Sequence, residues 1–148
     1  MKIVLFDIDN TVSSARWREA LKPPNATWDE YHAACADDKP NAEIVALIDA
    51  LAFNGYSCLG FTRRPEKWRT TTNLWMMTNK VNLTWFFMAD DKDFRNHVEV
   101  KVGMIETHFT EAQRRDIQFI IDDDPETCAA ITEKYGIASF NVRFRPKN

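Results

Sequence analysis

Short apolar runs alternate along the chain with longer segments in which apolar residues recur every three or four positions. The apolar runs predict five strands, at residues 2–6, 57–61, 84–88, 117–121 and 138–142. Four of these runs are nearly all apolar, which is typical of parallel strands covered on both faces. The alternation of such strands with helices predicts an α/β fold, a doubly wound parallel sheet.

Local end signals predict the helices between these strands. Thr27 and Glu30 have the spacing of a capping box before a short helix over residues 28–35. Asn41 is expected to cap a longer helix over residues 42–53. Further helices are expected at residues 66–79, 98–109 and 125–135.

One stretch departs from the alternation. Roughly 30 residues separate the first strand from the first crossover helix, and they contain a Pro-Pro pair and the short helix. We interpret residues 13–40, approximately, as a small cap or lid inserted after the first strand. Residues 1–148 are then expected to form a single domain, because 148 residues with 45% hydrophobic content supply one core and are too few for two ordinary domains.

Composition excludes several classes of protein. A balance of 19 basic against 22 acidic residues argues against a protein that binds nucleic acid by bulk positive charge alone. No apolar run approaches the roughly 20 residues that span a bilayer, and no signal-peptide pattern is visible, so we expect a cytoplasmic protein without membrane contact, in the host cytoplasm if phage-encoded. Three cysteines without CxxC spacing predict buried free thiols.

Polar residues gather where the predicted strands end. Asp7, Asp9 and Thr11 follow the first strand, Thr62, Arg63 and Arg64 follow the second, and Asp122, Asp123 and Asp124 follow the fourth. Lys101 lies near the start of the helix before that fourth strand. Because ligands bind at the carboxyl ends of strands in open parallel sheets, we expect these residues to form one site.

Each residue type in this set has a task in phosphoryl transfer. Asp7 is the candidate nucleophile that attacks phosphorus, and Asp9 is the candidate general acid and base. Thr62 is expected to hydrogen-bond a phosphate oxygen, and Lys101 to neutralise the phosphoryl group and hold Asp7 ionised. Mg²⁺, with its preference for oxygen ligands, offsets the repulsion of such carboxylates. The expected metal site consists of Asp7, Asp9, Asp122 and Asp123.

Taken singly, these signals have plain structural explanations. Acidic pairs are common in turns, a single helical lysine is usually solvated, and Asp124 before Pro125 is explained by helix capping. Their order along the chain, each predicted at the same edge of one sheet, favours a catalytic site over these structural explanations. Trp28 and Tyr31 on the lid are candidates for contact with a substrate base, whereas His32, like the other histidines, is interpreted as structural or solvated.

The order of these motifs resembles the haloacid dehalogenase (HAD) superfamily across nearly the whole chain. The motifs are FDIDNT at residues 6–11, FTRR at 61–64, VKVGMIE around Lys101 and IIDDDP at 120–125. The resemblance implies a Mg²⁺-dependent phosphatase with an aspartyl-phosphate intermediate on Asp7. Asp9 is then the acid and base and contacts the metal through its backbone carbonyl. Asp123 is the principal metal carboxylate, and Asp122 either supports it or pairs with Lys101.

Within that superfamily, the chain is most similar to the 3′-phosphatase domain of phage-type polynucleotide kinase-phosphatases. The similarity rests on residues 38–41, 68–75 and 93–95. The second motif of that family usually reads Ser/Thr-Gly-Arg. Here Arg64 matches the arginine of that motif, and Arg63 replaces its glycine. Arg18 lies where the family has a basic residue after the first motif. The residues expected to bind substrate are Thr11, Arg18, Arg63 and Arg64. The chain contains no GxxxxGK[ST] loop, so no kinase domain is expected within it.

The leading hypothesis is a phosphomonoesterase that acts on a phosphorylated nucleic-acid 3′ end. The alternatives are a nucleotidase of broad specificity and a non-catalytic HAD-fold protein that binds nucleic acid or a partner. Retention of both Asp7 and Asp9 favours the enzyme, because a relic has no chemical reason to keep them. A small lid is expected to leave the site open to a large substrate, with an entrance lined by Arg18, Arg63, Arg64 and Arg69.

Overall fold

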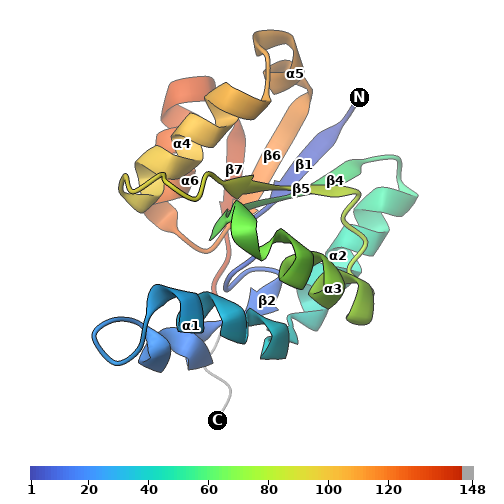
Figure 1. The fold of residues 1–148 in the computed structure, drawn as a ribbon. Coiled ribbons are helices and arrows are strands. Elements are labelled where there is room, and N and C mark those ends of the chain that lie inside the picture. The colour runs from blue at the N-terminus through green and yellow to red at the C-terminus, as the bar shows by residue number, and fades with distance from the viewer. Residues whose placement is uncertain (145–148) are drawn as a thin grey trace.

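The computed structural model describes residues 1–144. In this part of the chain, a sheet of five parallel strands has the order β5-β4-β1-β6-β7. The strands are β1 (Ile3–Phe6), β4 (Ser57–Pro65), β5 (Trp85–Ala89), β6 (Ile117–Asp122) and β7 (Ala138–Asn141). Helices cover both faces of the sheet, so the predicted doubly wound α/β fold is confirmed (Figure 1).

The two faces of the sheet bury two separate cores. The helices that cover them are α2 (Ala42–Phe53) and α3 (Arg69–Thr78) on one face, and α4 (His97–His108) and α6 (Pro125–Tyr135) on the other. Successive side chains of a strand point to opposite faces, so Val4 and Phe6 enter the first core while Ile3 and Leu5 enter the second. This is why β1 is apolar at every position.

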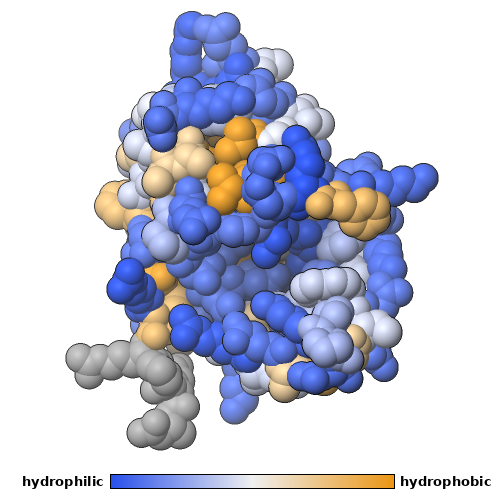
Figure 2. All heavy atoms as spheres, turned by 90° about the vertical axis from the view of Figure 1, so that its left-hand side faces the viewer, coloured by the Kyte–Doolittle hydropathy of each residue, from blue (hydrophilic) through white to orange (hydrophobic). Residues whose placement is uncertain are grey.

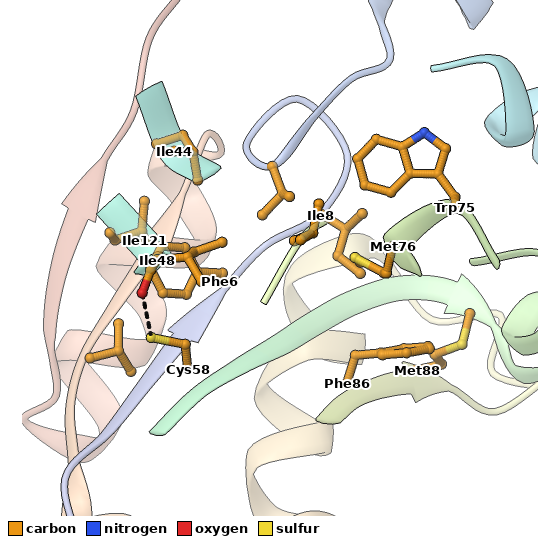
Figure 3. Close-up of a cluster of buried hydrophobic side chains, with 13 residues drawn as sticks. Phe6, Ile8, Ile44, Ile48, Cys58, Trp75, Met76, Phe86, Met88 and Ile121 are labelled. Atoms are coloured by element: carbon orange, nitrogen blue, oxygen red, sulfur yellow. Dashed lines mark hydrogen bonds between the residues drawn. The ribbon is translucent and has the colours of Figure 1, made fainter. Parts of the chain in front are cut away.

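Figure 3 shows the first of these cores. Ile44 and Ile48 of α2 pack against Phe6, and the thiol of Cys58 donates to the carbonyl of Ile48 at 3.8 Å. Trp75 of α3 closes the other end of the cluster, and its indole N–H donates to the carbonyl of Asp38 at 2.8 Å. The core therefore also fixes the segment that precedes α2. All three cysteines are buried free thiols, as predicted; they are Cys35, Cys58 and Cys128.

Residues 13–40, here named the cap segment, lie between β1 and α2. Its elements are β2 (Ser13–Ser14), the 3-10 helix η1 (Arg16–Leu21), α1 (Trp28–Ala33), the 3-10 helix η2 (Ala34–Asp37) and β3 (Lys39–Pro40). Strands β2 and β3 pair antiparallel and close the segment at its base. In Figure 1 the cap segment, in blue, faces the edge of the sheet at which the parallel strands end.

Most helix ends follow the sequence signals. Thr27 and Glu30 form the predicted capping box of α1. Asn41 lies at the N-cap of α2, but the prediction that its side chain caps the helix is wrong, because its amide donates instead to the carbonyl of Thr11 at 2.8 Å. The predicted helix over 66–79 divides into the 3-10 helix η3 (Glu66–Trp68) and α3.

Three features were not predicted: the β2–β3 ribbon, the 3-10 helix η1 and the helix α5 (Glu111–Asp116). Helix α5 begins with a capping box of Thr110 and Gln113, and the spacing of these two residues is a signal that the sequence alone provides. Across residues 1–144, the helices are all too short or too polar to cross a membrane.

Candidate active site

The carboxyl edge of the sheet brings the four motifs together. Asp7 follows β1 directly, and its N–H donates to the carbonyl of Ile121 in β6 at 2.9 Å. Strand β4 extends further than predicted, so Thr62 and Arg64 lie within it and are buried, while Arg63 between them is exposed. Figure 2 shows a hollow with hydrophilic walls between the sheet layer and the cap segment.

Lys101 joins the first and fourth motifs. Its Nζ donates to Oδ1 of Asp7 and to Oδ2 of Asp122, each at 2.6 Å. Burial would lower the pKa of Lys101, but the charges of Asp122 and Asp7 outweigh burial and raise it. The other oxygen of Asp122 accepts from the backbone N–H of Asp124 at 2.9 Å. Asp122 is therefore paired with Lys101, and one of its oxygens also lies close to those of Asp7 and Asp123.

The carboxylates of Asp7, Asp122 and Asp123 approach one another closely, with one oxygen of each within 4.8 Å of the others. Burial, and then the charge of Asp122, raise the pKa of Asp7 well above its ordinary value although Lys101 acts to lower it. Burial also raises the pKa of Asp123. Lys101 thus balances only part of the negative charge that these groups carry when ionised. An all-oxygen donor set with surplus negative charge fits a hard cation such as Mg²⁺.

Asp124 is engaged elsewhere. Its side chain accepts from the backbone N–H of Glu126 and from the hydroxyl of Thr127, as an N-cap of α6. It also pairs with Nε2 of His97 at 2.8 Å. The capping interpretation of Asp124 is therefore confirmed, and its carboxylate lies outside the Asp7 cluster.

Two threonines lie against the Asp7 cluster. The hydroxyl of Thr11 donates to Oδ2 of Asp7 at 3.0 Å, so Thr11 and Lys101 each hold one oxygen of that carboxylate. The hydroxyl of Thr62 accepts from the backbone N–H of Arg64 at 3.1 Å, and its own proton can be donated to a ligand. Both threonines are buried.

Asp9 is held by two arginines. Its Oδ1 accepts from Nη2 of Arg18 at 2.6 Å and from Nη2 of Arg64 at 2.7 Å. Burial alone would raise the pKa of Asp9, but the charges and hydrogen bonds of Arg64 and Arg18 outweigh it and hold this pKa well below its usual range. Asp9 is therefore ionised at neutral pH in this arrangement.

Asp38 completes the arginine cluster and was missed as a site residue. It lies just before β3, and its Oδ1 and Oδ2 accept from Nε and Nη2 of Arg18 at 2.8 and 2.7 Å. Nη2 of Arg64 lies 3.4 Å from Oδ2 of Asp38, and Nη1 of Arg64 donates to Thr72 of α3. The sequence offered one signal, because Asp38 belongs to the segment 38–41 on which the family similarity rests.

The expected entrance lined by arginines requires a correction. The side chains of Arg18 and Arg64 are 0% exposed, because each is enclosed by the carboxylates it neutralises. Arg63 is exposed on β4. Arg69 forms a paired contact with Glu66 and donates to the carbonyl of Phe86. The role of these arginines toward substrate stays a prediction, but Arg18 and Arg64 lie behind Asp9 instead of at an open surface.

Comparison with known proteins shows to which family the chain belongs. Residues 1–144 match the family model described as the polynucleotide kinase PNKP phosphatase domain. The chain belongs to this family. It is a HAD-type phosphatase, which confirms the predicted resemblance and favours the enzyme over the non-catalytic alternative. No curated protein matched this phosphatase domain in sequence.

Solved structures share the fold of this PNKP phosphatase domain at low identity. A chain of the Pnkp1/Rnl/Hen1 complex aligns with a TM-score of 0.79 and 18% identity over 95% of this chain and 45% of that chain. A chain of the Pnkp1/Rnl/Hen1 RNA repair complex gives 0.78 and 18% over 95% and 42%. The HAD-hydrolase YfnB from Bacillus subtilis, bound to magnesium, gives 0.66 and 11% over 99% and 90%. This domain therefore spans less than half of the Pnkp1-complex chains it matches.

Proposed function

We propose that this phosphatase removes the phosphate from polynucleotide 3′ ends through a phosphorylated intermediate on Asp7. The observation that carries the proposal is the match of residues 1–144 to the phosphatase domain of polynucleotide kinase. The RNA repair complex that contains a chain of this fold is consistent with a nucleic-acid end as substrate. The hollow beside a short cap segment supports a large substrate, since little of the chain is available to enclose a small one (Figure 2).

The proposed reaction has two steps. In the first, a carboxylate oxygen of Asp7 attacks phosphorus, and the bond from phosphorus to the 3′ oxygen of the sugar breaks. Because Arg64 and Arg18 hold Asp9 ionised in the free protein, Asp9 first takes up a proton from solvent and then supplies it to the leaving oxygen. In the second, Asp9 accepts a proton from water as that water attacks phosphorus, which releases phosphate and restores the carboxylate of Asp7.

The neighbouring side chains position this chemistry. Lys101 and Thr11 each hold one oxygen of Asp7, which fixes the orientation of the nucleophile. The proton of the Thr62 hydroxyl is available for a phosphate oxygen, since that hydroxyl accepts from the backbone of Arg64. The side chain of Asp9 is 24% exposed, while the arginines behind it are buried, so Asp9 can be reached from solvent.

The cofactor that fits the cluster is Mg²⁺. The residues that would hold it are Asp7, Asp122 and Asp123 through their carboxylates and Asp9 through its backbone carbonyl. When bound, the ion supplies positive charge that offsets the charge of the phosphoryl group and of the carboxylates. Lys101, paired with both Asp7 and Asp122, keeps these two carboxylates together before substrate arrives.

Substrate choice tests the proposal. A 3′-phosphorylated oligonucleotide is expected to be hydrolysed with higher kcat/KM than a 3′-mononucleotide, and 5′-phosphorylated ends are expected to be poor substrates. The advantage of the oligonucleotide should shrink as salt rises, because contacts with backbone phosphates release counterions. Equal kcat/KM for the oligonucleotide and the mononucleotide would contradict the proposal and favour a nucleotidase.

A matched pair of variants locates the backbone contact. Arg63 is exposed on β4 beside the site, whereas Arg115 is exposed on α5, at the far end of the sheet (Figure 1). Arg63→Gln is expected to lower the oligonucleotide advantage and its salt dependence, and Arg115→Gln to leave both unchanged. An Arg63→Gln variant with the parent's advantage would remove Arg63 from the substrate contacts.

A further inference from the structure

Three rings form a column at the seam between the cap segment and the sheet layer. Trp28 and His32 lie one turn apart on α1, with ring centroids 6.2 Å apart and planes inclined by 29°. The ring of Trp68, in η3 beyond the end of β4, lies 6.3 Å from the His32 ring at 32°. The rings thus face one another in sequence, and the outer one, Trp28, is 55% exposed.

The column stands beside the Asp9 side of the active site. The carbonyl of Tyr31 accepts from Nη1 of Arg18, whose Nη2 binds Asp9. The Tyr31 ring lies 5.6 Å from the ring of Trp28 and 5.1 Å from that of His32. A single arginine therefore separates Asp9 from the helix that carries the outer two rings.

Two buried polar atoms of the column lack partners. Among residues 1–144, neither Nδ1 of His32 nor Nε1 of Trp68 has a hydrogen-bond partner. An unsatisfied buried polar atom is costly, and native proteins keep few of them. Burial lowers the pKa of His32 to about 4, so the ring is neutral at pH 7 and offers one donor and one acceptor nitrogen.

We propose that Trp28, His32 and Trp68 form the binding site for the base of the 3′-terminal nucleotide, an inference that rests on the proposed function. The exposed face of Trp28 stacks on the base, and stacking suits a substrate of any sequence because every base has a flat π face. The rings of His32 and Trp68, whose unpartnered nitrogen atoms are buried, lie behind that face and support the ring of Trp28.

The column is assembled before substrate binds. Nζ of Lys67, next to Trp68, pairs with Asp29 on α1 at 2.5 Å and lies 5.5 Å above the Trp68 ring. This contact joins η3 to the cap segment across the seam. A site already in place loses less conformational entropy on binding than one that must be ordered.

The experiment compares two oligonucleotides that differ at one position. Both carry a 3′-phosphate, but the terminal nucleotide of the second lacks its base. The parent is expected to turn over the base-bearing end with kcat/KM at least about tenfold higher. Trp28→Ala should bring this ratio close to one, and Trp28→Phe, which keeps a ring, should retain part of it.

Trp85→Ala is the matched control. Trp85 is 52% exposed, close to the exposure of Trp28, but it begins β5 and therefore lies at the edge of the sheet opposite the active site. Its replacement is expected to leave both activity and ratio unchanged. Thermal melting of each variant reports whether the fold is retained.

The outcomes separate this inference from the proposed function. Efficient turnover of both oligonucleotides with a parental ratio near one would overturn the base site and leave the 3′-phosphatase proposal standing. A Trp28→Ala variant that melts at lower temperature but keeps the parental ratio would also overturn it, since the column then only docks the cap segment. Hydrolysis of an aryl phosphate without hydrolysis of either oligonucleotide would refute both proposals.

Discussion

The two aspartates of the first motif lie two residues apart and in opposite electrostatic surroundings. Asp7 stands among carboxylates, and burial together with the charge of Asp122 raises its pKa even though Lys101 is bound to it. Asp9 stands among arginines, which outweigh burial and lower its pKa. The carboxylates around Asp7 therefore attract a cation. The carboxylate of Asp9 is already neutralised by the two arginines. Two identical side chains thus acquire pKa values shifted in opposite directions by what the fold places around them.

The partners of these aspartates also come from different parts of the fold. Lys101 and Asp122 belong to α4 and β6, elements of the sheet and its covering layer. Arg18 and Asp38 belong to the cap segment, and Arg64 to β4. The Asp7 cluster is therefore built into the sheet edge, whereas the Asp9 cluster forms the joint between the sheet and the cap segment. Each half can be disturbed separately.

The largest expected effect is that of Asp7→Asn. The change removes the proposed nucleophile but preserves size and most hydrogen bonding, so hydrolysis of an aryl phosphate should fall by at least about a thousandfold. Asp49→Asn, on the exposed side of α2, is the matched control and should retain parental activity. Steady-state rates of the purified proteins provide the measurement. Asp7→Asn activity within about tenfold of the parent would exclude the covalent mechanism.

Asp38→Ala tests the Asp9 cluster by its effect on the free energy of unfolding. It leaves the buried guanidinium groups of Arg18 and Arg64 short of a carboxylate, and breaking a buried ion pair in this way costs about 3–5 kcal/mol. The free energy of unfolding, measured with urea, should fall by that amount. Asp37→Ala changes the exposed neighbour and should stay within about 0.5 kcal/mol of the parent. Equal stability of the two variants would mean that the arginine cluster does not hold the joint.

The same division explains what the sequence could predict. The strands and the helices α2 and α6 follow from apolar runs and end signals that act over a few residues. One topological rule, that parallel strands end at the same edge of the sheet, predicted that the fourth-motif aspartates and Lys101 lie beside Asp7. The outcome at Asp7 and Asp122 agrees with this rule.

The Asp9 half depended on tertiary contacts that no local pattern encodes. Arg18 and Arg64 were expected to line an open entrance, but the cap segment folds back and encloses them with Asp38. His32 was interpreted as structural or solvated, because a single histidine without spacing carries no information on its neighbours. Its position between two tryptophans depends on how η3 and α1 meet across the seam.

The smallest effect expected of these variants concerns the metal requirement of the Asp7 half. Activity should vanish with a chelator and return with Mg²⁺, and Ca²⁺ should support it poorly because its looser coordination misplaces the nucleophile. Asp123→Ala removes one proposed carboxylate ligand and should raise the Mg²⁺ concentration for half-maximal activity by at least about tenfold. The measurement is a Mg²⁺ titration of aryl phosphate hydrolysis at fixed ionic strength.

Asp124→Asn is the control that makes this test specific. It removes a negative charge next to Asp123 in sequence, but that charge caps α6 and pairs with His97 instead of joining the cluster. Asparagine serves as an N-cap about as well as aspartate, so the helix should be retained. The Mg²⁺ requirement of Asp124→Asn should therefore match that of the parent. If both variants raised it equally, the loss of nearby negative charge alone would explain the effect, and Asp123 would lose its assignment as a ligand.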